Sequence, residues 1–492
     1  MRLENHTYFL GTALILVMLS SMFYSCRKDD FTTDSGAKLS FSTDTLLFDT
    51  VFTTMSSTTK RIKVYNKNSD NLIISDIRLQ NGANSQFRIN VDGLSGNQHS
   101  DIEIRAGDSI YIFLEVTIDP NSVLSPFVVE EQLLFSTNGN NQKVHLMAWG
   151  QNAHYFTPKK YVNGLPPYSC LDGDCSGSLP PVTANWVNDK PYVIVGYLVI
   201  DSLDKLVIDP GVKVHLHNKS GLWVYKDGNL VVNGTPSDPV IFQGTRLEYT
   251  YQDISGQWDR IWINEGSADN VINHAIIKNA FIGIQAEPLP FNPTAPTSTN
   301  KLRLNGCEIT NSAAVNLLAT NYQVTDTNSL ITQAGQSSIF LRGGGNYKFY
   351  HTTIANFWDQ GTRDGSAVFL QNYYQDVNGN VQVRDIDSAV FVNTIIEGNN
   401  EIEFDTDVLA PGVINFKIDH SIVRSTKSLS GANYIGITQN PTAAVFIDYL
   451  NNNYKIGTSS PAANAGKQNT GVLYDKDGVF RNSPPDLGAY EN

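Results

Sequence analysis

Apolar and polar positions alternate along the first third of the chain. From Leu39 to about Phe156, segments such as "RIKVYN" and "IEIRAGDSIYIFLEVTI" place an apolar side chain at every second position. Such alternation is typical of β-strands with one buried face, and clusters of Asn, Asp, Gly and Ser separate the segments at hairpin spacing. Because one apolar face needs a second sheet to cover it, residues 39–156 are predicted to form a β-sandwich.

From Trp186 the apolar segments become shorter, and an internal repeat appears. The segments "HAIIKN", "GCEITN", "HTTIAN", "NTIIEG" and "HSIVRS" share a polar or glycine residue, a small residue and a β-branched aliphatic residue in one frame. Their first residues are separated by 32, 45, 42 and 27 positions. A fixed strand motif with uneven spacing predicts a β-solenoid whose coils carry insertions of different length. A β-propeller is the second interpretation, but it requires more uniform blades.

Residues that recur in this frame are interpreted as turn residues. His274, His351 and His420 begin three of the five repeats, and we place equivalent positions two coils apart at roughly 9–10 Å because stacked strands rise about 4.8 Å. One zinc ion with bonds of about 2 Å does not span that distance. Asn279, Asn311 and Asn356 also share a register, and we expect them to form an asparagine ladder rather than a catalytic group.

A segment rich in proline and glycine separates the two patterns. It contains Cys170 and Cys175, which flank "LDGD" and form either a small-loop disulfide or two free thiols. Cys307 stands alone in an apolar repeat and is interpreted as a small core residue. The chain is therefore predicted to be all-β, with a sandwich at 39–156, a linker or cap at 157–185, a solenoid at 186–455 and a C-terminal cap at 456–492.

Three parts of the chain resemble known families. "FDTVFTTMSSTTKRIKVYNKNSDNLIISDIRL" resembles the immunoglobulin-like domains of the Hydin type, while "LVIDPGVKV", "GNLVVNGT" and "PVIFQG" resemble the opening coils of right-handed parallel β-helix proteins of the pectate-lyase-like superfamily. The C-terminal "SPAANAG" and "DLGAYE" resemble the terminal signature of choice-of-anchor Q proteins, with Asn464 in place of the usual acid. The resemblance implies an immunoglobulin-like sandwich, a right-handed parallel β-helix and a cap over the last coil.

The N-terminus has the features of an export signal. Arg2 precedes an apolar run over 8–19 that is too short to span a bilayer, and Ser25 lies directly before Cys26. These residues, with the following "RKDD", resemble the signal of Bacteroidota surface lipoproteins. The resemblance implies a signal peptide at 1–25, lipidation of Cys26, a tether at 26–38 and a cell-surface-exposed location on the outer membrane. An ordinary secretory signal with an incidental cysteine is the alternative.

The net charge of the chain argues against nucleic acid as a partner. The 492 residues carry a formal net charge of −13, and no dense run of Lys and Arg occurs. Such a surface repels phosphate backbones, so nucleic acid is not an expected partner.

Candidate catalytic residues lie in the segment 342–364. Polysaccharide lyases on the resembled fold use a cation to neutralise a uronate and a base to abstract a proton, and Lys348, His351 and Arg363 are residues of the right types. Their mutual geometry, the first requirement for a general base, does not follow from the sequence.

Two other groups of side chains are candidate binding sites. The segment "EIEFDTD" alternates Glu401, Glu403, Asp405 and Asp407 with other residues, so as a strand it places four carboxylates on one face. Hard cations take oxygen ligands, which makes Ca²⁺ the candidate cofactor; a solvated acidic face is the other interpretation. Exposed aromatic rings could stack on sugars, or pack in the core or cap, and the candidates are Trp258, Trp262, Trp358, Tyr373 and Tyr374.

Two functions follow from these observations, and a structural spacer that merely displays the sandwich domain is a third possibility. The first is a non-catalytic binding or adhesion protein at the cell surface, with a polysaccharide or other glycan as ligand, because the scaffold is complete and no catalytic motif is recognisable. The second is a calcium-dependent polysaccharide lyase that acts on acidic glycans. No cofactor is required by the first function.

Overall fold

A computed structural model describes residues 30–121, 126–264, 268–288, 301–376 and 378–492. The predicted signal peptide and Cys26 lie outside the described residues. The chain divides into two compact units, residues 1–151 and 152–492. Within the described ranges, no helix has the length and apolar character needed to cross a membrane.

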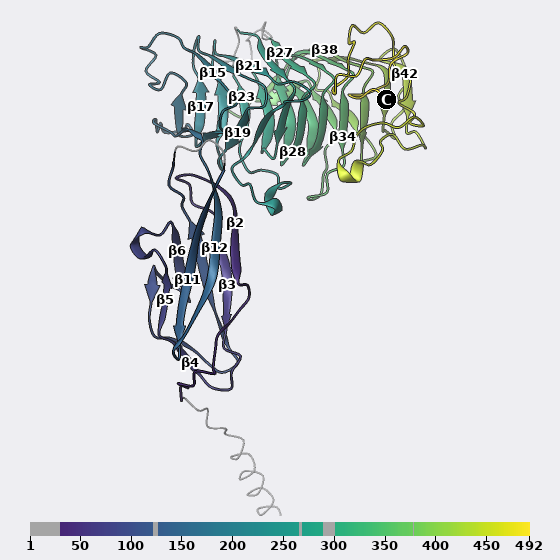
Figure 1. Cartoon of the computed structure of the whole chain (residues 1–492). Coiled ribbons are helices and arrows are strands. Elements are labelled where there is room, and N and C mark those ends of the chain that lie inside the picture. Colours follow the sequence, from purple (N-terminus) through teal and green to yellow (C-terminus); the bar gives the residue numbers. More distant parts are fainter. Residues whose placement is uncertain (1–29, 122–125, 265–267, 289–300, 377) are drawn as a thin grey trace, which may run out of the picture. The chain divides into compact units, whose positions relative to one another are not determined.

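The first unit is a sandwich of two five-stranded sheets (Figure 1). Alternate residues of each strand point inward, as in β10, where Ile112, Leu114 and Val116 are fully buried and the residues between them are not. The first sheet contains β1 (Ser40–Phe41), β3 (Lys60–Tyr65), β10 (Ser109–Val116), β6 (Phe87–Val91) and β7 (Leu94–Gly96). The second contains β2 (Thr45–Phe52), β12 (Asn140–Gln151), β11 (Phe127–Thr137), β5 (Asp76–Leu79) and β8 (Gln98–His99); β4 (Leu72–Ile74) pairs with β9 (Ile102–Ile104).

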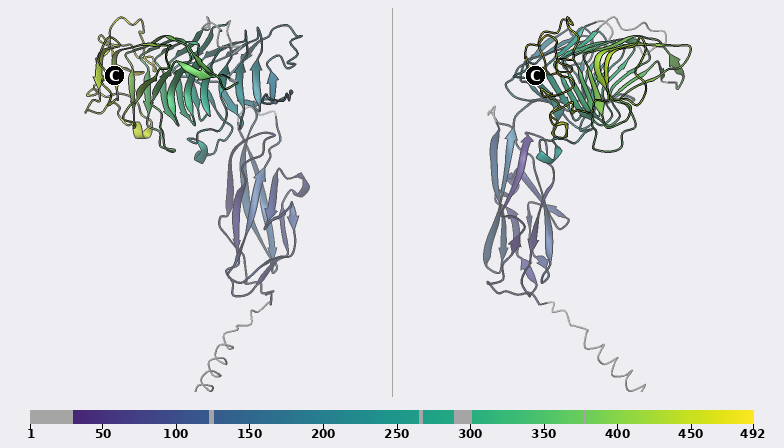
Figure 2. Two further views of the ribbon diagram at one scale, coloured as in Figure 1. Left: turned by 180° about the vertical axis from the view of Figure 1, so that it is seen from behind. Right: turned by 90° about the vertical axis from the view of Figure 1, so that its right-hand side faces the viewer.

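The second unit is a parallel β-helix, which Figures 1 and 2 show as strands stacked side by side along its length. Each complete coil contributes two strands to a nineteen-stranded sheet and one strand to a nine-stranded sheet. Through most of the solenoid each strand pairs in parallel with the strand three places further along the chain, as β24, β25 and β26 do with β27, β28 and β29. The predicted all-β chain with an N-terminal sandwich and a parallel β-helix is confirmed.

The strands of the solenoid are short, in agreement with the sequence pattern. The nine-stranded sheet contains β14 (Tyr168–Cys170), β17 (Tyr197–Ile200), β20 (Gly221–Val224), β23 (Ile261–Ile263), β26 (Ile282–Ala286), β29 (Val315–Thr320), β32 (Ser337–Arg342), β35 (Val368–Gln371) and β40 (Phe404–Asp407). The nineteen-stranded sheet contains β13 (His154–Phe156), β15 (Thr183–Trp186), β16 (Tyr192–Ile194), β18 (Lys205–Ile208), β19 (Lys213–Leu216), β21 (Asn229–Asn233), β22 (Val240–Gly244), β24 (Asn270–Asn273), β25 (Ala275–Lys278), β27 (Lys301–Asn305), β28 (Glu308–Ser312), β30 (Gln323–Thr327), β31 (Leu330–Ala334), β33 (Gly345–Tyr350), β34 (Thr353–Asn356), β38 (Ile386–Val392), β39 (Ile395–Gly398), β41 (Ile414–Val423) and β42 (Tyr434–Gln439).

Within the described residues, the remaining elements are a hairpin and three short 3₁₀ helices. The hairpin β36 (Tyr373–Gln375)–β37 (Val381–Val383) is inserted between β35 and β38. The 3₁₀ turns are η1 (Gly82–Asn84), η2 (Tyr249–Tyr251) and η3 (Tyr449–Asn451).

The segment between the two sequence patterns contributes to the first coils. Phe156, the predicted end of the sandwich, lies in β13, which pairs with β16 of the second unit. Residues 157–185 supply β14 and part of β15 to the two sheets of the solenoid. Phe156, Trp186 and Tyr192 stack at this end of the core, with ring centroids 5.3 and 4.2 Å apart.

The recurring turn positions have a left-handed backbone. His274, Gly306, His351, Asn393 and His420 have φ between 43° and 61°, a region that glycine, asparagine and histidine enter more readily than other residues. A Cβ atom on Gly306 would lie 2.4 Å from the His274 ring, so glycine is required where the ring approaches the next coil.

One coil of the solenoid is not among the five repeats that the sequence motif identifies. Asn328 also has a left-handed φ of 59°, and it lies 22 residues after Gly306 and 23 before His351. The interval of 45 residues therefore contains two coils, which places His274 and His351 three coils apart rather than two. Coils without insertions have about the same length, and the irregular spacing comes from insertions such as the β36–β37 hairpin.

The asparagine side chains bond across neighbouring coils at all three positions, and two of them pair with each other as predicted. Asn311 Nδ2 donates to Asn279 Oδ1 at 2.8 Å and to the Asp253 carbonyl oxygen at 2.8 Å. Asn356 differs, because its side chain bonds to both the N–H and the carbonyl group of Ala334.

The C-terminal segment packs along the side of several coils rather than over the last coil alone. Its apolar residues join Leu330, Ala355 and Ile395 on the outward face of the nineteen-stranded sheet. Within the "DLGAYE" signature, Asp486 accepts the backbone N–H groups of Asn464 and Asn492, and thereby holds the segment in a closed loop.

Replacing Asn311 with alanine is expected to lower the free energy of unfolding of the solenoid by about 2–3 kcal/mol. The variant loses a largely buried hydrogen-bond network and places a Cβ-bearing residue without a polar side chain at φ 57°. Asn311→Gly retains the backbone freedom and should recover about 1 kcal/mol of the loss. Urea unfolding followed by tryptophan fluorescence measures this, since five of the six tryptophans lie in the second unit. An unchanged urea midpoint for Asn311→Ala would contradict the structural role of the ladder.

Candidate functional site: an aromatic pocket on the nine-stranded sheet

The three candidate catalytic residues have separate environments. Lys348 is exposed on β33, where Thr325 and Val390 are its neighbours in the adjacent coils. His351 is fully buried at a turn, with Nε2 2.9 Å from Asn393 Nδ2. Burial, together with the charge of Arg481, lowers the pKa of His351 to about 3, so its imidazole is neutral and structural at neutral pH. None of the hydrogen bonds and ion pairs of the described residues joins these side chains.

Arg363 forms a buried ion pair instead of a catalytic contact. Its guanidinium donates to both carboxylate oxygens of Glu403, one at 2.8 Å, and the two side chains are 2% and 0% exposed. Glu403 also accepts the Ala367 N–H, and Arg363 donates to the carbonyl oxygens of Asn356 and Gly365. This network ties the loop after β34 to the strand β40 of the next coil.

The four candidate calcium ligands do not converge. The prediction that all four carboxylates share an outward face is wrong, because Glu403 points into the protein to pair with Arg363. Asp405 pairs with Lys427, and Asp407 accepts the Tyr373 hydroxyl and the Gln371 amide. Glu401 lies apart on an exposed position before β40. In the described parts of the chain, these carboxylates form no group close enough to share one ion.

Most of the candidate stacking residues are buried. Trp258, Trp358 and Tyr374 are only 1%, 8% and 4% exposed, and none of them lines the aromatic pocket described below. A hydrogen bond also holds the Trp258 indole in its buried position, because its Nε1 donates to the Lys278 carbonyl oxygen at 2.9 Å. Of the five candidates, Trp262 and Tyr373 remain partly exposed.

Trp262 belongs to a row of side chains on the outward face of the nine-stranded sheet. Its neighbour in the preceding coil is Trp223, and the two indoles stack with centroids 4.7 Å apart and planes inclined by 15°. Each tryptophan lies between two fully buried aliphatic residues of its own strand, so the alternation of the strand directs both indoles outward. Val199 precedes Trp223 in the row, and Gln285 follows Trp262.

The two indoles line a pocket of about 630 Å³. Tyr225 adds a second ring orientation, because its ring is inclined by 88° to that of Trp223, and its side chain is 37% exposed. Tyr168 and Leu165 contribute further apolar surface. The polar lining residues are Asp201, Asn264 and Glu287.

Glu287 gives the pocket a defined polar end. Its Oε1 accepts Trp262 Nε1 at 2.9 Å and Gln285 Nε2 at 3.0 Å, which orients both side chains. The equivalent indole nitrogen of Trp223 has no hydrogen-bond partner among the described residues, although it is buried. An unsatisfied buried donor carries a free-energy cost of about 1–3 kcal/mol.

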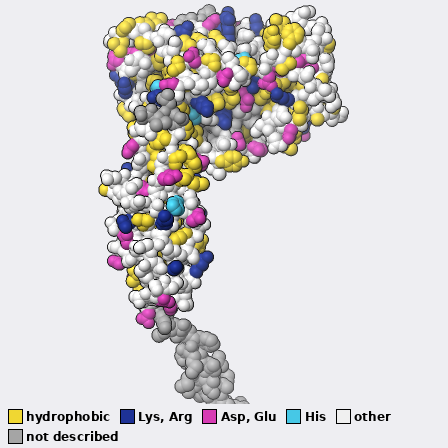
Figure 3. Space-filling model, viewed as in Figure 1, with side chains coloured by type: hydrophobic (Ala, Val, Ile, Leu, Met, Phe, Trp, Pro, Cys, Tyr) yellow, Lys and Arg dark blue, Asp and Glu magenta, His cyan; other side chains and the backbone are white. Residues whose placement is uncertain are grey.

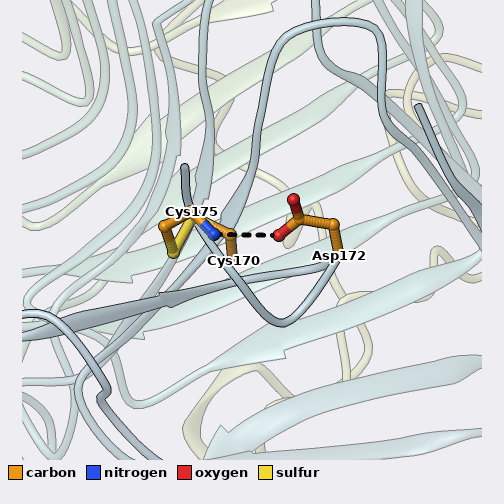
Figure 4. Close-up of side chains that lie close together, drawn as sticks. All are labelled: Cys170, Asp172 and Cys175. Carbon is orange, nitrogen blue, oxygen red and sulfur yellow. Dashed lines mark hydrogen bonds between the residues drawn. A yellow bond between two sulfur atoms is a disulfide. The ribbon is translucent and has the colours of Figure 1, made fainter. Parts of the chain in front are cut away.

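A disulfide between Cys170 and Cys175 forms part of the pocket wall. Figure 4 shows the loop that it closes, in which the Cys175 N–H donates to Asp172 Oδ1 at 3.1 Å. Cys170 follows Tyr168 in β14, so the bridge holds the loop beside the first strand of the outward row. The third cysteine of the described residues, Cys307, is fully buried in the core, where burial raises the pKa of its thiol to about 12.

Trp223 was not among the candidate stacking residues, although the sequence around it shares a pattern with that around Trp262. "LWV" at 222–224 and "IWI" at 261–263 both place a tryptophan between two aliphatic residues of a short strand. The register that stacks them depends on the length of the intervening coil, including its insertion, and therefore required the structure.

No protein-family model and no curated protein matches the chain. Among solved structures, the catalytic domain of a GH87 alpha-1,3-glucanase in complex with tetrasaccharides is 10% identical, over 77% of this chain and 86% of that chain, with a TM-score of 0.17. The ASH/PapD-like domain of human CEP192 is 6% identical, over 26% and 93%, with a TM-score of 0.17. A family 123 glycoside hydrolase from Clostridium perfringens is 9% identical, over 24% and 30%, with a TM-score of 0.18. The chain thus spans less than a third of the length of the last protein, and at these TM-scores no functional argument follows.

Replacing Arg363 with alanine is expected to destabilise the solenoid by about 3–5 kcal/mol, because it leaves the Glu403 carboxylate buried without a counter-charge. Lys348→Ala removes an exposed cation and should change the free energy of unfolding by less than about 0.5 kcal/mol. Urea unfolding of the two variants and the unsubstituted protein measures the difference. Equal stability of Arg363→Ala and the unsubstituted protein would contradict the structural assignment of this arginine.

Proposed function

We propose that the protein is a non-catalytic glycan-binding protein whose binding site is the pocket of Trp223, Tyr225, Trp262 and Glu287. The observation that carries the proposal is the pairing of two aromatic ring orientations with a carboxylate end inside one pocket. Binding sites for small molecules combine apolar walls with a few placed polar groups in this way.

The chemistry of a sugar fits such a lining. A pyranose ring has faces that carry C–H groups and edges that carry hydroxyl groups. Aromatic rings provide apolar surface with little conformational entropy to lose, and their π faces attract the partly positive C–H groups. The side chains of Asp201, Asn264 and Glu287, which line the pocket, can accept hydroxyl hydrogen bonds.

The charges of the pocket favour neutral over acidic glycans. Asp201 and Glu287 are the charged residues among its lining residues, and their carboxylates repel a uronate. Over the visible face of the protein, acidic and basic side chains are interspersed (Figure 3). The dispersed positions of Lys348, His351 and Arg363 support binding without lyase chemistry, which requires a base at the proton it abstracts.

The proposed location is the cell surface, where Cys26 carries lipid chains that insert into the outer membrane. The apolar run before Cys26 and the "RKDD" after it support export and anchoring. The disulfide between Cys170 and Cys175 suits an extracytoplasmic compartment, because such bridges persist in oxidising surroundings.

Trp262→Ala is expected to weaken glycan binding by at least about tenfold, because it removes a central aromatic wall and the donor that orients Glu287. Affinity gel electrophoresis against neutral polysaccharides (glucans, mannans, xylans, galactans) and acidic ones (polygalacturonate, alginate) identifies a ligand, and calorimetry with an oligosaccharide of that ligand measures the affinity. Tyr249→Ala is the matched control, since Tyr249 is 81% exposed and lies outside the pocket.

Three results would contradict the proposal. The first is that Trp262→Ala binds the glycan as tightly as the unsubstituted protein. The second is that none of the tested polysaccharides retards the protein in the gel. The third is that unsaturated uronate products accumulate from polygalacturonate or alginate. The last result would favour the lyase function.

Cys26→Ser is expected to abolish incorporation of labelled palmitate and to move the protein from the outer-membrane fraction to the soluble fraction, because no lipid chains can then be attached. Expression with the native N-terminus in a Bacteroidota host and cell fractionation measure this. Cys307→Ala, which alters a buried cysteine, should retain the label. Membrane association of Cys26→Ser equal to that of the unsubstituted protein would overturn the anchor.

A further inference from the structure

A second pocket lies where the last coils of the solenoid meet the C-terminal segment. It has a volume of about 410 Å³, and its lining includes Glu397, Glu401, Arg424, Phe357, Phe446 and Tyr449. It shares no residue with the aromatic pocket of the proposed glycan site. Any function of this pocket is therefore separate from the proposed glycan binding.

Glu397 is the unusual residue of this pocket. It lies on the outward face of β39, beside Ala355 of the preceding coil and one position beyond the pair formed by Ile396 and Val423. Its neighbour in the next coil is therefore Arg424. The Glu397 side chain is only 7% exposed, yet among the described residues no Lys, Arg or His nitrogen lies within ion-pair distance of its carboxylate.

The environment of Glu397 disfavours its charged form. Burial raises the pKa of Glu397 to about 7, although the Arg424 charge and the Gly398 N–H act in the opposite direction. The neighbouring carboxylate Glu403 adds repulsion, but Glu403 has its own counter-charge in Arg363. Glu397 is thus a buried acid without a paired cation, and it lines a pocket that is accessible from outside.

Aromatic rings form another part of the wall. The rings of Phe357 and Tyr449 stack with centroids 4.0 Å apart, and Phe446 meets Phe357 edge-on, inclined by 87°. The formal charge of the lining is −1, from two glutamates and one arginine. Carboxylates beside aromatic faces attract organic ammonium ions, because the ring quadrupole and the acid charge act in the same direction.

Arg424 does not occupy the place of such a cation. Its side chain is exposed, and its Nε donates to the Asn400 carbonyl oxygen at 2.9 Å rather than to a carboxylate. A hard metal ion fits less well than an organic cation. Calcium takes six to eight oxygen ligands, whereas the side chains of this wall offer two carboxylates, the Thr426 hydroxyl and the Asn440 amide among several aromatic and aliphatic groups.

We propose that this pocket binds a primary ammonium group carried on an organic ligand, with Glu397 as its hydrogen-bonded counter-charge and Phe357 and Tyr449 against its apolar part. A primary ammonium can add N–H donors to the Glu397 carboxylate beside the Gly398 N–H, whereas a quaternary ammonium supplies charge alone.

Calorimetric titration of the full chain with butylammonium at pH 8 tests the proposal. We expect the unsubstituted protein to bind butylammonium with a Kd on the order of 1 mM. Tetramethylammonium should bind the unsubstituted protein at least about tenfold more weakly, and so should butylammonium bind Glu397→Gln. Glu103→Gln, which alters an exposed acid on β9 of the first unit outside both pockets, should bind butylammonium as tightly as the unsubstituted protein. The far-ultraviolet circular dichroism and melting temperature of Glu397→Gln establish that the variant is folded, and Phe357→Leu provides a second variant whose binding should weaken.

The pH dependence adds a readout that non-specific attraction to the acidic surface does not reproduce. Only the ionised form of Glu397 pairs with the ligand, and its pKa is about 7. Butylammonium, which titrates like lysine near 10.4, stays charged throughout. The affinity should therefore rise about tenfold or more from pH 5.5 to pH 8, and Glu397→Gln should abolish the rise.

Several outcomes would overturn the proposal. They are undiminished binding by folded Glu397→Gln, equal affinity for tetramethylammonium and butylammonium, no binding of either cation, or preferential binding of galacturonate at pH 5.5. Failure here leaves the glycan site untouched, because that site is tested by Trp262→Ala.

Discussion

The structure of the second unit depends on the hydrogen bonds between strands of successive coils. Each of these parallel ladders forces equivalent residues of successive coils into rows about 4.8 Å apart. A backbone turn must therefore recur at the same place in every coil, and left-handed residues provide it at Gly306, Asn328 and His351. The N–H groups of these residues bond to carbonyl groups of the next coil, so the ladder continues through the turn.

The rows also distribute polar side chains between structural and exposed positions. Arg363 and Glu403 are 40 residues apart in the sequence but meet in adjacent coils, and Asn279 and Asn311 meet across 32 residues. These pairs satisfy groups that would be costly to bury alone. Arg363 and His351, two of the three residues that suggested catalysis in the sequence, are consequently occupied in holding the coils and their insertions together, whereas Lys348 is exposed.

The fold could be predicted because its determinants are local. Period-two alternation indicated the sandwich, and a recurring frame of small, polar and β-branched residues indicated the solenoid. The site could not be predicted from the same signals. Whether Trp262 stacks on Trp223, and whether Glu403 points inward, depends on the length of every insertion between the two coils. Asn328 shows the limit at the level of one residue, because its repeat "NSLITQ" differs enough from the other five to be missed, and the coil count was wrong by one.

Alternation within each strand separates stability from binding. Leu222 and Val224 remain in the core on either side of Trp223, and Ile284 and Ala286 do the same beside Gln285. The inward row must stay aliphatic to keep the coils stacked, whereas the outward row can carry tryptophan, glutamine or valine without a change in the core. The proposed glycan site on the outward row of one sheet and the buried acid on the outward row of the other can therefore differ in chemistry while the same ladder holds both.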